Sequence, residues 1–426
     1  MEKARTLIIS TLRHELISGS FYIFLGTTIS SLLAFILNLF LVRNLTYADY
    51  GIFASLISVI LLLTIPAQSL TAVIVRYAAK FFTTGEDERA GAFYFKLFKY
   101  LIVFCLFVIL GFVVLSPIIS EFLKIDDFSV IFITGITVAA FYLATLNIAF
   151  LQSMLLFKKL SALYIISGIG KLITGIVLVY AGLKSFGALF GNLMFPIISY
   201  FGSLVVLKKV IAERSERVNI PVKEFVDYAL PTTIAVLALS SFISTDVILV
   251  KHYFPPIDAG IYGGLSLIGR VIFYFTGPIP IVMFPLVVNR FAKKENYNNL
   301  LYLSLFLVLL PAVCITIFYF ILPQFTINIF LGGRAYLTLI PLIGIFGIFL
   351  TLYSLNNVFV SFLLAIKKTN VALIVFIFAL LQVILIYLYH DSFIHIIWAS
   401  IAASVLLLFF LILYYLKING INYSKK

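Results

Sequence analysis

Twelve long apolar runs constrain this chain more than any other feature of its sequence. The hydrocarbon core of a bilayer is about 30 Å thick, so a helix needs about 20 apolar residues to cross it. Runs of about that length or more lie at 18–42, 50–75, 97–119, 129–157, 161–182, 186–207, 229–250, 260–288, 299–322, 337–366, 370–389 and 394–416. Hydrophobic residues make up 63% of the chain and charged residues 11%, too few charges to cover a soluble domain. The sequence therefore predicts an all-α polytopic membrane protein with twelve transmembrane helices.

The lysines and arginines between these runs are divided unequally between the two sides of the predicted membrane. Of the 30, 23 fall on one side, five on the other and two inside spans. Short loops rich in Lys and Arg stay in the cytoplasm, so both termini are expected there. Residues 1–20 carry charges and lack an apolar core with a cleavage site, so the first span is expected to direct insertion. The basic residues are scattered, which argues against a nucleic-acid partner.

The longest link between spans, residues 208–228, separates the runs into two sets of six. Short matches recur 209 positions apart, as in Gly51-Ile-Phe53 at the second run and Gly260-Ile-Tyr262 at the eighth. This pattern indicates an internal duplication, and because each half has an even number of spans the repeats run parallel, with a central cavity expected between them. The predicted organisation is an N-terminal six-helix lobe at 1–207, a cytoplasmic linker at 208–228 and a C-terminal six-helix lobe at 229–426.

Two cations lie inside predicted spans. Arg270 is about ten residues, or roughly 15 Å, from the outer end of the run 260–288, and Lys171 lies at a similar depth in 161–182. A charge at that depth costs about 3 kcal/mol on insertion scales, so it normally faces water or a partner. A guanidinium fork and an ammonium at one level suit a pyrophosphate group. In the alternative reading each is structural and bonds backbone carbonyls freed by nearby glycine or proline.

Asp246 is the only carboxylate inside a predicted span. It fits three roles: a proton or sodium coupling site, a counter-ion to Arg270, or an interfacial residue that reaches water.

Amide side chains inside spans fit two roles, hydrogen bonding to sugar hydroxyls or bonding between helices. The substrate-binding candidates among them are Asn38, Asn147, Gln152 and Asn356. The four histidines are scattered and the two cysteines lie in apolar runs, and there is no phosphate-binding glycine loop. We therefore expect no metal site, no cofactor and no enzymatic activity.

Several short segments resemble those of the polysaccharide transporters. They are Tyr50-Gly-Ile-Phe53, Arg76-Tyr-Ala-Ala-Lys80, Ser185–Gly191, Tyr228-Ala-Leu-Pro231, Gly260-Ile-Tyr262 and Ile329–Tyr336. The chain is similar over its full length to the O-antigen-type oligosaccharide flippases of the multidrug, oligosaccharidyl-lipid and polysaccharide exporter superfamily. The resemblance implies a V-shaped, two-lobed transporter in the cytoplasmic membrane of a prokaryote. Because the first two helices of each half line the cavity in that family, it keeps Arg76 as a candidate for phosphate capture, although snorkelling to the interface also explains this residue.

The function predicted from the sequence is translocation of a polyprenyl-pyrophosphate-linked oligosaccharide for cell-surface glycan assembly. Expected partners are that lipid-linked oligosaccharide, membrane lipids, and the glycosyltransferases and polymerase of the same pathway. One alternative is a cation-coupled multidrug exporter with Asp246 at its centre. A second is a membrane scaffold for glycan assembly that transports nothing.

Overall fold

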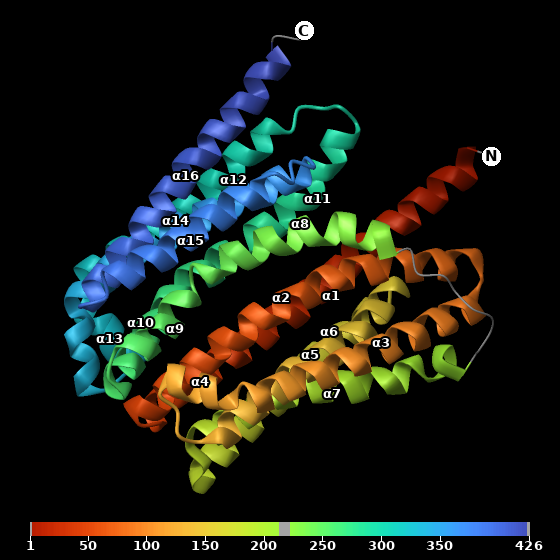
Figure 1. Cartoon of the computed structure of the whole chain (residues 1–426). Helices are drawn as coiled ribbons and strands as arrows, with labels where there is room; N and C mark the ends of the chain where they lie inside the picture. The colour runs from red at the N-terminus through yellow and green to blue at the C-terminus, as the bar shows by residue number, and fades with distance from the viewer. Residues whose placement is uncertain (1, 213–221, 424–426) are drawn as a thin grey trace. The chain divides into compact units, whose positions relative to one another are not determined.

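The computed structural model describes residues 2–212 and 222–423, and within them the chain is almost entirely helical, with no strand (Figure 1). Inside a bilayer every backbone N–H and C=O group must be bonded within the protein, and an α-helix achieves this within a single segment. The predicted all-α class is confirmed. Of the predicted linker at 208–228, residues 213–221 lie outside the described part of the chain.

Contacts between residues divide the chain into two compact units. Unit 1 comprises Met1–Leu45 and Pro66–Val226. Its elements are α1 (Glu2–Asn44), the second part of α2 (Tyr47–Thr84), α3 (Asp87–Val114), α4 (Ser116–Leu123), α5 (Phe128–Ser153), α6 (Phe157–Leu178), η1 (Val179–Leu183) and α7 (Lys184–Ala212). Helix α6 packs against α1 and α7, and α5 packs against α3 and α7.

Unit 2 comprises Thr46–Ile65 and Asp227–Lys426, so it includes the first part of α2. Its other elements are α8 (Val222–Ser241, from Asp227 on), α9 (Thr245–Tyr253), α10 (Pro256–Thr276), α11 (Pro278–Ala292), α12 (Asn298–Ile321), α13 (Pro323–Phe330), η2 (Arg334–Leu339), α14 (Ile340–Ala365), α15 (Val371–Leu388) and α16 (Phe393–Tyr423). Helix α14 is the centre of this unit, because it packs against α10, α11, α12 and α16.

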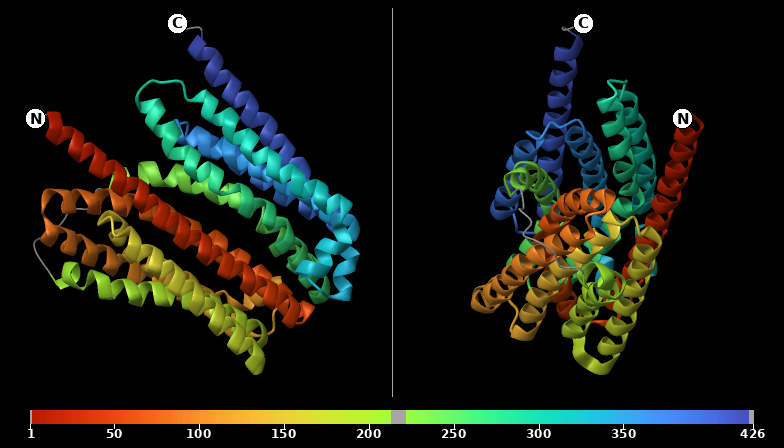
Figure 2. Two further views of the ribbon diagram at one scale, coloured as in Figure 1. Left: turned by 180° about the vertical axis from the view of Figure 1, so that it is seen from behind. Right: turned by 90° about the vertical axis from the view of Figure 1, so that its right-hand side faces the viewer.

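Ten helical stretches among the described residues are long and apolar enough to cross a membrane, and the bent pair α8–α9 makes an eleventh. One of the ten, Phe157–Lys208, has 52 residues and would measure about 78 Å as a straight helix. It turns back instead, at Gly182 with φ 87° and Lys184 with φ 44°. Its two halves, α6 and α7, then lie side by side (Figure 2). The described residues thus contain twelve spans, as predicted from the sequence.

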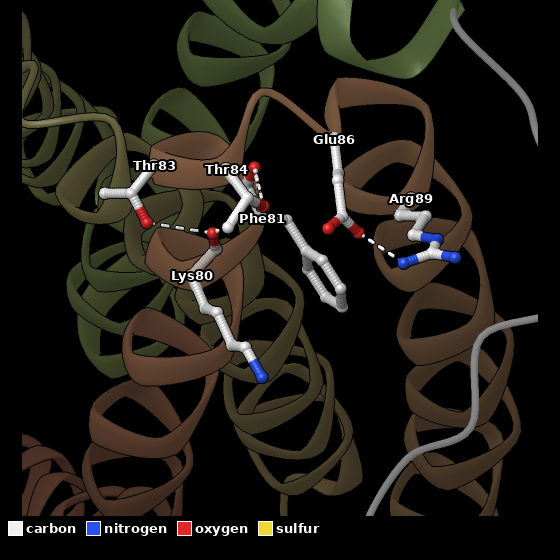
Figure 3. Close-up of polar contacts among 6 residues, drawn as sticks. All are labelled: Lys80, Phe81, Thr83, Thr84, Glu86 and Arg89. Atoms are coloured by element: carbon white, nitrogen blue, oxygen red, sulfur yellow. Dashed lines mark hydrogen bonds and ion pairs between the residues drawn. The ribbon is translucent and has the colours of Figure 1, made fainter.

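The turn between α2 and α3 has the polar contacts of a water-exposed connection (Figure 3). An Arg89 guanidinium nitrogen lies 2.6 Å from a Glu86 carboxylate oxygen, and both side chains are exposed. This hydrogen bond lowers the pKa of Glu86. Exposed ion pairs of this kind contribute little to stability. The pair therefore indicates that the turn lies in water, where two spans end, and it does little to stabilise the fold.

The first part of α2 packs very closely on α10 within unit 2. A Cβ atom added to Gly51 would lie 2.8 Å from the Gly260 backbone nitrogen, and one added to Gly260 would overlap the Tyr47 carbonyl oxygen. These two glycines are the ones that the sequence relates by an offset of 209. The duplicated segments therefore contact each other through positions where only a hydrogen atom fits between the helices.

We expect Gly260→Ala to lower the free energy of unfolding by about 1–3 kcal/mol, the usual cost of overpacking, because a backbone carbonyl cannot rotate out of the way. Gly111→Ala in α3 is the matched control, since its added methyl group meets no atom within 4 Å. Thermal unfolding of both purified variants in one detergent measures the difference. Equal stability of the two variants would contradict the close approach of α2 and α10.

Candidate functional site

Helices α8 and α9 form one predicted span that is bent by 48° between Ser241 and Thr245. In a continuous helix the Ile243 carbonyl would accept a hydrogen bond from the Val247 N–H group. Here that N–H group donates to Asp246 Oδ1 at 2.8 Å. The break therefore frees backbone carbonyls inside a span, where side chains have to supply the missing donors.

Two side chains from other helices bind these carbonyls. Arg270 on α10 donates from Nη2 to the Ile243 carbonyl at 2.8 Å. Gln382 on α15 donates from Nε2 to the Phe242 carbonyl at 3.0 Å. The structural role predicted for Arg270, a hydrogen bond to a freed backbone carbonyl, is thus observed for one of its nitrogens. The carbonyl is freed by the break between α8 and α9, however, and not by a neighbouring glycine or proline.

The rest of the Arg270 guanidinium is available for other contacts. Its side chain is partly buried, and Nε is buried without a hydrogen-bond partner in the described part of the chain. A guanidinium carries five N–H donors. The charge lies near the Asp246 carboxylate and the hydroxyl groups of Tyr50 and Tyr353. Arg270 therefore belongs to a polar centre inside unit 2.

Asp246 is fully buried in the first turn of α9. Its carboxylate accepts from its neighbour Val247 and, at 2.9 Å, from the Tyr262 hydroxyl on α10. The positive end of the helix dipole also favours a carboxylate at this position. Of its three predicted roles, an interfacial residue that reaches water does not fit this burial, whereas a coupling site and a counter-ion to Arg270 both do.

Lys171 occupies a comparable polar position inside unit 1. Its Nζ atom donates to Asn192 Oδ1 on α7 at 2.6 Å. The exposed apolar stripe of α6 contains Ile166, Ile169 and Ile173, and at 100° per residue Lys171 lies on the opposite face. Its charge therefore faces the interior of unit 1 and not the apolar exterior.

The other predicted binding residues do not converge on one point of either unit. Asn38 donates to the Ala34 carbonyl of its own helix, and Gln152 hydrogen-bonds with Tyr164. Asn147 accepts a hydrogen bond from the Tyr94 hydroxyl and donates one to the Tyr200 carbonyl. Asn356 donates to the Ser404 carbonyl. Arg76 is exposed. Asn147 and Asn356 thus connect helices, as expected for the bonding role. The Asn356 Oδ1 atom is nevertheless buried without a partner among the described residues.

Sequence reasoning missed two members of the polar interior of unit 2. Tyr50 is 2% exposed although it opens a span, and the only signal for it is the glycine beside it. Lys251 was assigned to a connection between spans, yet it lies in the last turn of α9 and is 1% exposed. Because a cation at a helix C-terminus is favoured by the helix dipole, the burial of Lys251 has a local explanation.

Solved structures with the same fold define the class of this protein. An inward closed conformation of the lipid II flippase MurJ matches with a TM-score of 0.72 and 16% identity, over 92% of this chain and 87% of that one. An inward-facing multidrug resistance MATE family transporter of the MOP superfamily matches with a TM-score of 0.77 and 9% identity, over 95% and 100%. An outward-facing conformation of a multidrug resistance MATE family transporter of the MOP superfamily matches with a TM-score of 0.63 and 12% identity, over 95% of this chain and 96% of that one. The chain is a multi-span membrane protein with the fold of these transporters.

The family follows from the sequence itself. The model of the family described as "Polysaccharide biosynthesis protein" matches residues 16–291. This chain belongs to that family, and the resemblance drawn from its short segments is confirmed. No curated protein matches the chain in sequence.

The charge state of Asp246 has a measurable consequence. A hydrogen bond to a charged group contributes about 1.5–3 kcal/mol and one between neutral groups about 0.5–1.5 kcal/mol. We expect Tyr262→Phe, which removes a donor to Asp246, to lower the free energy of unfolding more than Tyr319→Phe, which removes a bond to the Ile268 carbonyl. Both tyrosines are buried in unit 2, and chemical unfolding in detergent compares them. Equal losses would mean that Asp246 is neutral.

Proposed function

We propose that this protein is a flippase that moves a polyprenyl-pyrophosphate-linked oligosaccharide across the cytoplasmic membrane of a prokaryote by alternating access. The observation that carries the proposal is Arg270, a partly buried guanidinium inside a span with one nitrogen bonded to backbone and another without a partner among the described residues. Arginine binds phosphate through two parallel N–H donors, which makes its spare donors suited to a pyrophosphate. Membership of a polysaccharide biosynthesis family supplies the pathway.

The remaining residues take supporting roles in this proposal. Lys171, inside unit 1, is a second candidate cation for the phosphate, and Arg76 captures phosphate at the cytoplasmic end of α2. Asn356 keeps a buried carbonyl oxygen for a sugar hydroxyl. Asn38, Asn147 and Gln152 are the further candidates for sugar contacts. Both termini lie in the cytoplasm, as the excess of Lys and Arg supports.

The protein carries out no covalent chemistry in this proposal. The structures that share its fold are a flippase and a transporter, which supports a role in transport without catalysis. The enzymes that build and polymerise the glycan are its expected partners. Asp246 couples transport to a proton or sodium gradient, because it is a buried carboxylate that interacts with the proposed phosphate-binding arginine.

A cation-coupled multidrug exporter is the second candidate, and the burial of Asp246 is the observation that favours it. A single buried carboxylate in the polar centre suits a cationic drug if Arg270 is fully occupied by the Ile243 carbonyl. The non-transporting scaffold is the third function considered from the sequence. The charged cluster does not support it, because charges inside a span are costly and usually mark a functional site.

Substitution of Arg270 tests the proposed substrate. We expect Arg270→Gln to weaken binding of undecaprenyl pyrophosphate in nanodiscs about 10- to 100-fold, the equivalent of about 1.5–3 kcal/mol for a charged hydrogen bond. Arg270→Lys should give a smaller loss, because it keeps the charge without the fork. Binding measured by thermal shift over a ligand titration reports both.

The control for this experiment is Thr316→Val, which removes a buried hydrogen bond to Thr351 elsewhere in unit 2. It should bind like the wild type. If Arg270→Gln binds undecaprenyl pyrophosphate with wild-type affinity, the phosphate-binding role is wrong. Tighter binding of cationic dyes than of undecaprenyl pyrophosphate by the wild type would favour the exporter.

Substitution of Asp246 tests the coupling. Asp246→Asn keeps only one of the two oxygens, which bind the Val247 N–H group and the Tyr262 hydroxyl separately, and it can neither ionise nor bind a proton. We expect flipping of a fluorescent lipid-linked oligosaccharide in proteoliposomes to lose its response to an imposed pH or sodium gradient. Asp258→Asn, at the start of α10 and partly exposed, should keep that response. A response retained by Asp246→Asn would remove Asp246 from the coupling mechanism.

A further inference from the structure

Gln382 lies at the break between α8 and α9, on a helix that contributes no charged group to the polar centre. Its side chain is fully buried. The two hydrogens of its amide are both used, one on the Phe242 carbonyl at 3.0 Å and one on the Ser400 hydroxyl at 2.9 Å. It therefore connects the break in one span to α15 and α16.

We propose that Gln382 is a positioning residue for the Arg270 site. By binding the Phe242 carbonyl, it leaves Arg270 with only the Ile243 carbonyl to satisfy and with N–H donors to spare for phosphate. The inference rests on the proposed function for its ligand. The neutral Gln382 amide contacts no substrate, and its role is to keep the Arg270 guanidinium available for phosphate.

The two carbonyls at the break are adjacent in the chain. Phe242 and Ile243 are consecutive, and their carbonyls are bound by different helices, α15 and α10. A buried carbonyl without a donor is unfavourable. Without Gln382, the unused buried donors known near the break are the Ser244 hydroxyl, within the break itself, and the Arg270 guanidinium, which already binds the next carbonyl. A second bond from Arg270 to the break would consume donors that the phosphate needs.

The same contact also fixes the direction of α9. This helix starts two residues beyond Ile243, and its first turn contains Asp246. Because both carbonyls of the break are hydrogen-bonded, α9 keeps its direction, and the Asp246 carboxylate stays within hydrogen-bond distance of the Tyr262 hydroxyl on α10. Gln382 thus positions both charged members of the site through the backbone between them.

Hydrogen exchange at the break provides a test that needs no ligand. We expect Gln382→Met, which preserves the volume of the side chain, to speed exchange of the amides of residues 244–248 at least tenfold in the full-length protein. Ser400→Ala is the matched control, because it removes the other partner of the same amide and leaves the Phe242 bond in place. Gln382→Leu, which also lacks a donor, serves as a second variant if Gln382→Met does not fold.

Binding of undecaprenyl pyrophosphate provides the functional arm. Gln382→Met should raise the Kd at least threefold in the wild-type background and have no further effect in Arg270→Gln, because it acts through that arginine. Ser400→Ala should leave the Kd unchanged. A purely structural loss would instead add to the Arg270→Gln effect, and that additivity would overturn the inference.

The two arms separate this inference from the proposed function. If the wild type does not bind undecaprenyl pyrophosphate, the proposed function fails, and exchange at the break alone decides whether Gln382 positions Arg270. If the wild type binds it and Gln382→Met changes neither exchange nor Kd, the positioning role is wrong while the proposed function stands. Faster exchange with non-additive loss of binding supports both.

Discussion

The need to satisfy every backbone polar group inside the bilayer governs this protein. Most of the described spans meet that need largely through their own helical hydrogen bonds. The α8–α9 span does not, because the Val247 N–H group binds Asp246 and leaves the Ile243 carbonyl without its helical partner. The donors come from Arg270 and Gln382. The polar centre of unit 2 is therefore the set of side chains that a broken helix requires.

The same constraint explains why charges are tolerated there. Asp246 has two donors, the Val247 N–H group and the Tyr262 hydroxyl, together with the end of a helix dipole and a nearby guanidinium. Each contact reduces the cost of burying a carboxylate. In unit 1 the single ammonium of Lys171 is accommodated more simply, by one amide oxygen on the neighbouring helix. Arg270 and Lys171 thus differ in the donors that they leave free, because a guanidinium has donors in several directions whereas an ammonium is a compact point charge.

Much of the fold was predictable because the bilayer restricts the possible solutions. Run length predicted the spans, and the gap between the runs 161–182 and 186–207 predicted the hairpin between α6 and α7 even though the helical stretch there is nearly unbroken. The offset of 209 paired Gly51 with Gly260, and the structure puts these glycines in contact. The sequence also identified Arg270, Lys171 and Asp246, since a charge inside an apolar run is visible without coordinates. Their partners were not predictable, because the Ile243 carbonyl is freed by a break in a span and Asn192 resembles any other amide within a span.

The break between α8 and α9 shows why charged residues were easier to identify from the sequence than the bend in the span. Residues 240–246 read Ser-Ser-Phe-Ile-Ser-Thr-Asp, with neither glycine nor proline, so no residue that conventionally breaks a helix marks the position. Serine, threonine and aspartate side chains compete for backbone groups when they cluster, and Asp246 does so by accepting from Val247. The carboxylate thereby creates the free carbonyl that Arg270 binds, which makes the bend and the pairing of charges one feature. The pattern that links them is an acid five residues after a serine pair inside an apolar span, with an arginine in the next span.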